Sequence, residues 1–84
     1  MLNPYGIDQA IRVIGNNAED ASVGIFDAQG RLLRNLTATG RRDGEAVFSW
    51  DGRTALGQEV PAAALFVRAE SNGCAVTRRI VLMR

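Results

Sequence analysis

The sequence predicts an all-β domain, a small antiparallel sandwich of six to seven short strands. Three observations support this fold class. Apolar, β-prone runs recur at spacings near ten residues, which is typical of sandwiches. Gly or Pro interrupts nearly every window long enough for three helical turns, so helices between the strands have no sequence to occupy. Two of the apolar runs end in Asp and Gly residues typical of tight turns, at Asp27 to Gly30 and at Asp51-Gly52.

The first part of the chain contains three predicted strands. Ile11 to Ile14 form a short strand that ends at the turn cluster Gly15-Asn16-Asn17. The second strand covers Val23 to Asp27 and the third covers Leu32 to Thr37. Because the Gln29-Gly30 turn joins them directly, we expect these two strands to form a hairpin.

The middle of the chain supplies a connection, a strand and a loop. Residues Ala38 to Gly44 are rich in Gly, Thr and Arg, and we expect this polar stretch to cross between the two sheets. The alternating run Glu45 to Trp50 predicts the next strand. The loop of residues 51–57 then leads to the short Glu59-Val60-Pro61, where the proline indicates an edge strand or a strand end.

The last part of the chain predicts a long hairpin. Its strands, Ala64 to Ser71 and Cys74 to Leu82, are separated by Asn72-Gly73, the strongest short hairpin signal available. A chain of 84 residues is near the size at which one core just suffices, so residues 1–84 are expected to form a single sandwich domain.

Large side chains must supply most of the core, because the many alanines bury little area. The candidate core aromatics are Phe26, Phe48, Trp50 and Phe66. Alternation along residues 45–50 places Phe48 and Trp50 on the same face as Ala46, which supports their burial.

Five residues are expected to shape turns rather than to carry chemistry: Asp27, Gly30, Asp51, Gly52 and Gly57. An Asp at the start of such a turn commonly accepts backbone N–H groups, and Gly supplies the left-handed backbone that the turn requires.

Composition excludes several classes of function. The ten basic and nine acidic residues leave a net charge of +1, which disfavours nucleic acid as a partner. The chain has no histidine, and Cys74 is its only cysteine, so it lacks the groups for a Ser-His-Asp triad, a Cys-His dyad or a His/Cys zinc site. No apolar run is long enough to span a membrane. We therefore expect no catalytic residue, no cofactor and no metal.

Two binding alternatives stay open at this stage. Asp51 with nearby carbonyls, or Glu19-Asp20 with Asp43, could supply oxygen ligands to a structural calcium, although neither has the dense Asp spacing of a calcium loop. Trp50 could form a sugar-stacking platform if it were exposed, but its alternation favours the core and leaves Tyr5 as the one aromatic expected at the surface.

A series of motifs runs in order through almost the whole chain. These are Asn3-Pro4, Ile25-Phe26-Asp27, the run Gly30 to Leu36, and Trp50 to Arg53 with Gly57. In this order the chain resembles the FlgD-like immunoglobulin-fold domain, which occurs in flagellar hook-capping proteins and, in related form, at the C-terminus of many exported bacterial proteins. Type IX secretion sorting domains share the pattern, and their final basic strand corresponds to residues 77–82. The resemblance implies an immunoglobulin-like, fibronectin III-like sandwich.

For function, the resemblance implies a non-catalytic module from the C-terminus of a larger, extracytoplasmic protein that is secreted, periplasmic or held at the cell surface. We expect it to act in sorting or anchoring, with the exposed side of the terminal hairpin as docking surface, including Arg68, Arg78 and Arg79. The expected partner is a protein, either secretion machinery or a neighbouring domain of the parent protein. The alternatives are a structural or assembly module, which could self-associate, and a carbohydrate-binding module.

Overall fold

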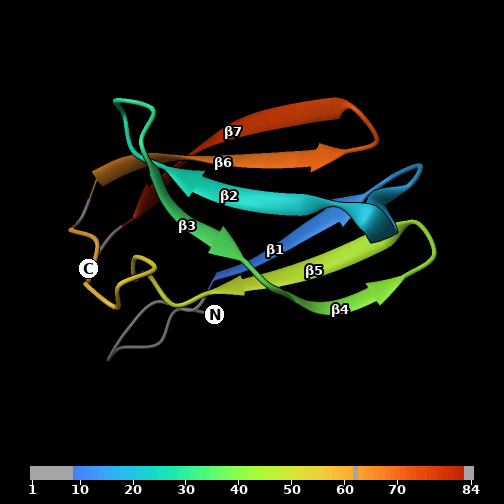
Figure 1. Ribbon diagram of the computed structural model, residues 1–84, viewed down its shortest axis with the longest axis horizontal. Helices are drawn as coiled ribbons and strands as arrows, with labels where there is room; N and C mark the ends of the chain where they lie inside the picture. The colour runs from blue at the N-terminus through green and yellow to red at the C-terminus, as the bar shows by residue number, and fades with distance from the viewer. Residues whose placement is uncertain (1–8, 62, 83–84) are drawn as a thin grey trace.

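The computed structural model describes residues 9–61 and 63–82. Within these ranges seven strands form two layers (Figure 1). In chain order the strands are β1 (Gln9–Ile14), β2 (Ser22–Phe26), β3 (Leu32–Leu36), β4 (Ala38–Arg42), β5 (Glu45–Trp50), β6 (Ala63–Ser71) and β7 (Cys74–Leu82). A single 3₁₀ turn, η1 (Ala18–Asp20), follows β1. The predicted all-β antiparallel sandwich is confirmed.

The two sheets are arranged so that each side of the sandwich holds one edge strand from each sheet. The three-stranded sheet has the order β1-β5-β4, and the four-stranded sheet has the order β3-β2-β6-β7. Thr37 alone joins β3 to β4, so the chain crosses between the sheets at that point. Figure 1 shows β3 running down from the four-stranded sheet into the connection to β4, with β7 at the top of the view and β4 at the bottom.

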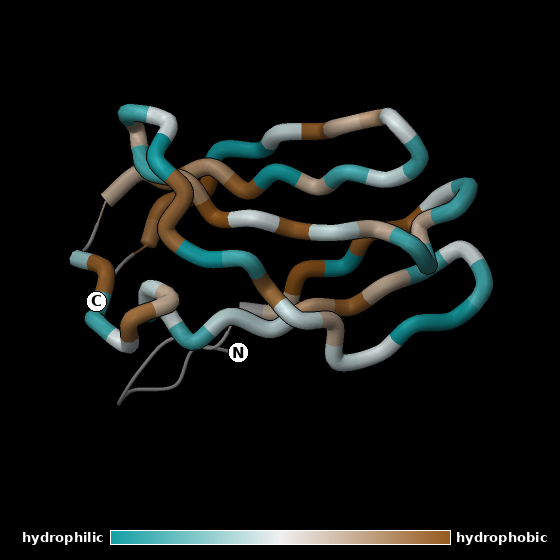
Figure 2. The backbone as a smooth tube through the Cα atoms, in the orientation of Figure 1, coloured by the Kyte–Doolittle hydropathy of each residue, from teal (hydrophilic) through white to brown (hydrophobic). Residues whose placement is uncertain are grey.

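The core lies between the inner faces of the two sheets. Alternation sends every second residue of a strand inward, and Figure 2 shows apolar segments, in brown, spread along the strands of both sheets. The buried core cluster consists of Ala21, Val23, Ile25, Ala46, Phe48, Trp50, Val60, Leu65, Val67 and Leu82. Phe48 and Trp50 are 0% and 1% exposed, and burial of such a side chain contributes about 1.5–3 kcal/mol.

Phe26 and Phe66 lie outside this core, which corrects the expectation that all four aromatics are buried. Both are half-buried, and they are directly paired across β2 and β6. Phe26 follows the buried Ile25, and Phe66 stands between the buried Leu65 and Val67. Since consecutive strand residues point to opposite faces, both rings lie on the outer face of the four-stranded sheet.

Two expectations about connections also need correction. The stretch Ala38 to Gly44 does not cross between the sheets, because most of it is the strand β4 of the three-stranded sheet. β4 pairs with β5 and contains a register irregularity between Ala38 and Gly40. As an exposed edge strand, β4 needs no apolar alternation, which explains its polar sequence. Glu59-Val60-Pro61 forms no strand, and only an isolated bridge joins Glu59 to Arg53.

Candidate docking surface

The terminal hairpin presents a long accessible strand. β6 and β7 pair along their whole length, from Ala63↔Leu82 to Ser71↔Cys74. Asn72 and Gly73 have φ of 51° and 81°, and a tight two-residue turn of this kind requires positive φ at both positions. β7 is the last strand of its sheet, and every residue of it before Ile80 is exposed. The hairpin therefore combines a free strand edge with two accessible faces.

The three arginines named from the sequence do not form one cluster. Arg79 pairs with Phe66, and Arg68 lies two positions further along β6, so both are on the outer face of the four-stranded sheet. Arg78 pairs with the buried Val67 and therefore lies on the inner face. The structure thus brings Arg68 and Arg79 together and separates Arg78 from them.

The charges around the hairpin are only partly balanced. Arg68 Nε lies 2.9 Å from Glu70 Oε1 in an ion pair on the outer face. Within the described ranges, neither Arg78 nor Arg79 forms an ion pair, and both side chains are exposed. Each face of β7 therefore carries one uncompensated positive charge, which favours acidic groups on a partner.

A row of four residues crosses the outer face of the four-stranded sheet. Direct pairing aligns Leu32, Phe26, Phe66 and Arg79, one from each strand. Leu32 is 50% exposed. A Cβ at Gly24 would lie 3.1 Å from Phe26 Cε1 and 3.2 Å from Leu32 Cδ1, so the absence of a side chain at Gly24 lets both pack close to the sheet. We call the four aligned residues, Leu32, Phe26, Phe66 and Arg79, the aromatic row. This row was not predicted from the sequence, although Phe26 follows Ile25 directly in a strand, and this order indicates that the two side chains point to opposite faces.

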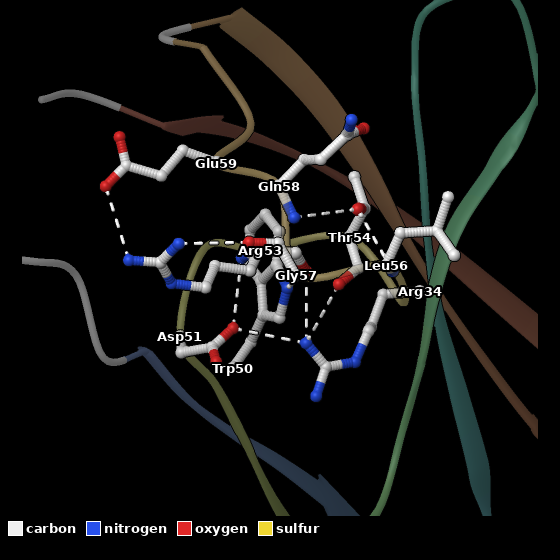
Figure 3. A network of polar contacts seen from close by, with 9 residues as sticks. All are labelled: Arg34, Trp50, Asp51, Arg53, Thr54, Leu56, Gly57, Gln58 and Glu59. Atoms are coloured by element: carbon white, nitrogen blue, oxygen red, sulfur yellow. Dashed lines mark hydrogen bonds and ion pairs between the residues drawn. The ribbon is translucent and has the colours of Figure 1, made fainter.

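The loop after β5 is stabilised by its own polar groups and by one side chain from β3 (Figure 3). Trp50 Nε1 donates to the carbonyl oxygen of Arg53 at 2.9 Å. Asp51 Oδ1 accepts the backbone N–H of Arg53 at 3.0 Å. Arg34 Nη1 lies 3.2 Å from the same Asp51 oxygen and 3.2 Å from the Arg53 carbonyl oxygen. Trp50 and Asp51 therefore hold the loop in place, and Arg34 ties it to the other sheet.

The turn glycines named from the sequence occupy left-handed backbone positions. Gly30, Gly52 and Gly57 have φ of 84°, 81° and 84°, values that residues with a Cβ rarely adopt. Arg53 Nη1 also donates to the Gly57 carbonyl oxygen at 3.0 Å, which closes the loop at its far end.

Asp27 holds the β2–β3 turn through both carboxylate oxygens. Its Oδ1 accepts the backbone N–H groups of Gln29 and Arg31, each at 2.9 Å, and its Oδ2 accepts Arg31 Nε at 2.7 Å. These bonds lower the pKa of Asp27 below its ordinary value of 3.8, chiefly through the backbone N–H of Arg31, while partial burial opposes the shift. The carboxylate is thus engaged in shaping the turn.

Glu19, one of the acidic residues considered as a calcium ligand, has a structural partner. Glu19 Oε1 accepts the backbone N–H of Gly44 at 3.2 Å. In residues 9–61 and 63–82, no three acidic or sulfur-bearing side chains gather where they could hold a metal ion, and no charged side chain is buried. Trp50 is buried and presents no platform for a sugar, and Tyr5 lies outside the described residues. No described helix is long and apolar enough to cross a membrane.

Two antiparallel sheets with this strand order and an inner aromatic core define an immunoglobulin-like β-sandwich. The family model for the FlgD Ig-like domain matches residues 8–73, which include all of β1 to β6 and end at the hairpin turn. The chain therefore belongs to the FlgD Ig-like domain family, and this membership indicates a structural or assembly module. No curated protein matches the sequence.

Proposed function

We propose that this domain is a non-catalytic docking module of an exported bacterial protein, and that it acts in sorting or anchoring by binding a protein partner through its terminal hairpin. The observation that carries the proposal is β7, an edge strand that is exposed along most of its length and bears on each face an arginine with no ion-pair partner among the described residues. In this proposal residues 1–84 are the C-terminal module of a longer precursor.

Protein contact fits the surface better than other kinds of recognition. A net charge of +1 gives no broad positive field for a polyanion. The exposed apolar side chains Leu32 and Val81 share the outer face of the four-stranded sheet with Arg68 and Arg79, and such a mixture of apolar and guanidinium groups is typical of protein interfaces.

An export assay tests the proposal. Residues 3–84 are fused behind a signal peptide and a reporter, in a host that has the type IX machinery. We expect export of the reporter, and we expect export to fall at least several-fold when Arg68, Arg78 and Arg79 are all changed to Gln. The matched control changes Arg12, Arg31 and Arg42 to Gln, which removes the same charge from other exposed positions. Retention of the parent fusion inside the cell would contradict the sorting role.

The aromatic row favours one second candidate, an assembly module that packs against a neighbouring domain or another copy. Leu32 and Val81 are 50% and 56% exposed on that face. Light scattering after size exclusion, with and without the parent protein's other domains, tests this function. Formation of a complex that the Phe66→Ser substitution weakens would support this function. A strict monomer that binds none of those domains would count against it.

A further inference from the structure

The two open sides of the sandwich differ. On the β3–β4 side the chain itself crosses between the sheets, and the backbone N–H of Ala55 donates to the Leu33 carbonyl oxygen at 3.1 Å, which occupies part of the β3 edge. On the β1–β7 side no described segment connects the two edge strands (Figure 1). Among the described residues, β1 and β7 each pair with one neighbouring strand only, so both have an edge that faces this side.

A groove of about 560 Å³ lies between these two edges. Its apolar lining comes from Ile11 and Val13 of β1, Val67 and Ala69 of β6, and Val76 of β7. Val76 pairs with Ala69 and so points inward, yet it is 52% exposed. An inward residue of a sandwich stays this exposed when no strand of the opposite sheet covers it.

The shape of the groove fits an extended segment. β1 pairs with β5 on one side only, so half of its backbone N–H and C=O groups are directed to the groove side. At one end Ser71 Oγ donates to the Asn17 carbonyl oxygen, which links the hairpin to the turn after β1. A strand of about four to six residues, at about 3.3 Å per residue, would match the length of β1. Every second side chain of that strand would face Val67 and Val76.

The charge of the groove indicates what such a segment carries. Arg78 lines the groove and has no ion-pair partner within the described ranges. The other charged residues of the lining are already paired, Arg12 with Glu45 at 3.1 Å and Glu70 with Arg68 at 2.9 Å, and strand alternation directs both of their side chains to the outer faces of the sheets. The unbalanced charge is thus positive, and a carboxylate in the occupant would balance it.

The same charge disfavours pairing of β7 with the β7 strand of a second copy of the chain. Arg78 is the central residue of β7, which runs from Cys74 to Leu82. Two copies of β7 paired antiparallel over their full length would place each Arg78 opposite its counterpart. Like charges in direct cross-strand positions are destabilising.

We propose that the groove between β1 and β7 binds an extended segment of a partner protein, which adds to the edge of β1 as a further strand. The segment has apolar side chains at alternate positions and a carboxylate that reaches Arg78. This inference rests on the proposed docking function and specifies its mode, in which main-chain hydrogen bonds supply affinity and alternate side chains supply specificity.

Selection from a peptide library tests the proposal. Random ten-residue peptides displayed on phage are selected on the folded 84-residue chain, and the recovered peptides are resynthesised with a fluorophore. Anisotropy titration measures their affinity for the domain. We expect the recovered peptides to alternate apolar and polar residues and to contain Asp or Glu.

The chain offers two matched control pairs. Val76→Arg and Arg78→Glu alter the groove and should each weaken peptide binding at least tenfold. Leu56→Arg and Arg42→Glu make changes of the same kind at exposed positions outside both the groove and the terminal hairpin, and should leave affinity within about twofold. Bound peptide should also slow alkylation of Cys74, the only cysteine, which lines the groove.

Three results would overturn the inference: recovery of no peptide, binding that the control variants weaken as much as the groove variants, or dimerisation of the wild type that Val76→Arg abolishes. The export assay separates this inference from the proposed function. If both groove variants are exported normally, the strand-addition mode is wrong but the proposed docking function stands. If peptides bind in the groove but the fusion is not exported, the sorting role is wrong but the groove as a binding site stands.

Discussion

Phe48 and Phe66 show how strand direction decides the role of a single residue. Both are phenylalanines in the middle of a strand, but Phe48 points between the sheets and is fully buried, whereas Phe66 points away and is half-buried beside Phe26. The difference follows from strand alternation. Phe48 shares its face with the buried Ala46 and Trp50, whereas Phe66 stands between the buried Leu65 and Val67 and so points to the opposite face.

The two phenylalanines should therefore differ in their effect on stability. Phe48→Ala leaves a cavity in a fully packed core and should lower the free energy of unfolding by about 3–5 kcal/mol. Phe66→Ala removes a half-buried ring and should cost about 1–2 kcal/mol. Urea titration followed by the fluorescence of Trp50, the only tryptophan, measures both. Equal losses would contradict the assignment of the two rings to different faces.

Asp27 should make the stability of the β2–β3 turn depend on pH. Its pKa is lower in the folded chain than its ordinary value of 3.8, so its contribution is fully present above that value and is lost as the pH falls through the lowered pKa. Asp27→Asn should thus destabilise the domain at about pH 6, and the gap between wild type and variant should shrink towards about pH 2. Thermal unfolding across this range measures the gap. A gap that stays constant would contradict the role of the ionised carboxylate.

Among the elements, the terminal hairpin depends most on local sequence. Asn72 and Gly73 both have positive φ, and Asn-Gly predicts a two-residue turn because these two residue types adopt that backbone conformation most readily. The turn then fixes the register of β6 and β7, and through it the faces on which Arg78 and Arg79 lie.

Substitution of two glycines tests the importance of this turn. Gly73→Ala places a Cβ at φ of 81° and should lower stability by about 1–2 kcal/mol, because the left-handed conformation is strained for residues with a side chain. Gly40→Ala is the control, since a Cβ there meets nothing within 4 Å and φ is not in the left-handed region. It should change stability by less than about 0.5 kcal/mol. Chemical denaturation of both variants gives the comparison.

Local pattern predicted the hairpins and the buried face of β5, whereas features that depend on pairing could not be read from the sequence. β4 has a polar sequence because it is an exposed edge strand, so its residues resemble a loop. The β2–β3 pairing slips between Ile25 and Phe26, which places Leu32 and Arg34 on opposite faces and lets Arg34 reach Asp51. Alternation along β7 predicts that Arg78 and Arg79 lie on opposite faces. The groove beside Arg78 could not be predicted in this way, because it depends on the order of strands in both sheets.

At the scale of the whole molecule, the sandwich has one side that the chain occupies and one that it leaves open. The crossing at Thr37 joins the sheets beside β3 and β4, while β1 and β7 border an apolar groove with an unbalanced arginine. No charged side chain is buried among the described residues, so in the proposed function the groups that recognise a partner lie at the surface.

Amide hydrogen exchange of the domain, with and without a peptide recovered from the library, tests most directly the claim that partners dock on this open side. We expect slower exchange in β1, where the added strand accepts its free backbone N–H groups, together with smaller changes in β7 and none in β3 or β4. Protection confined to β3, β4 or the loop of residues 51–57, with β1 unchanged, would contradict it.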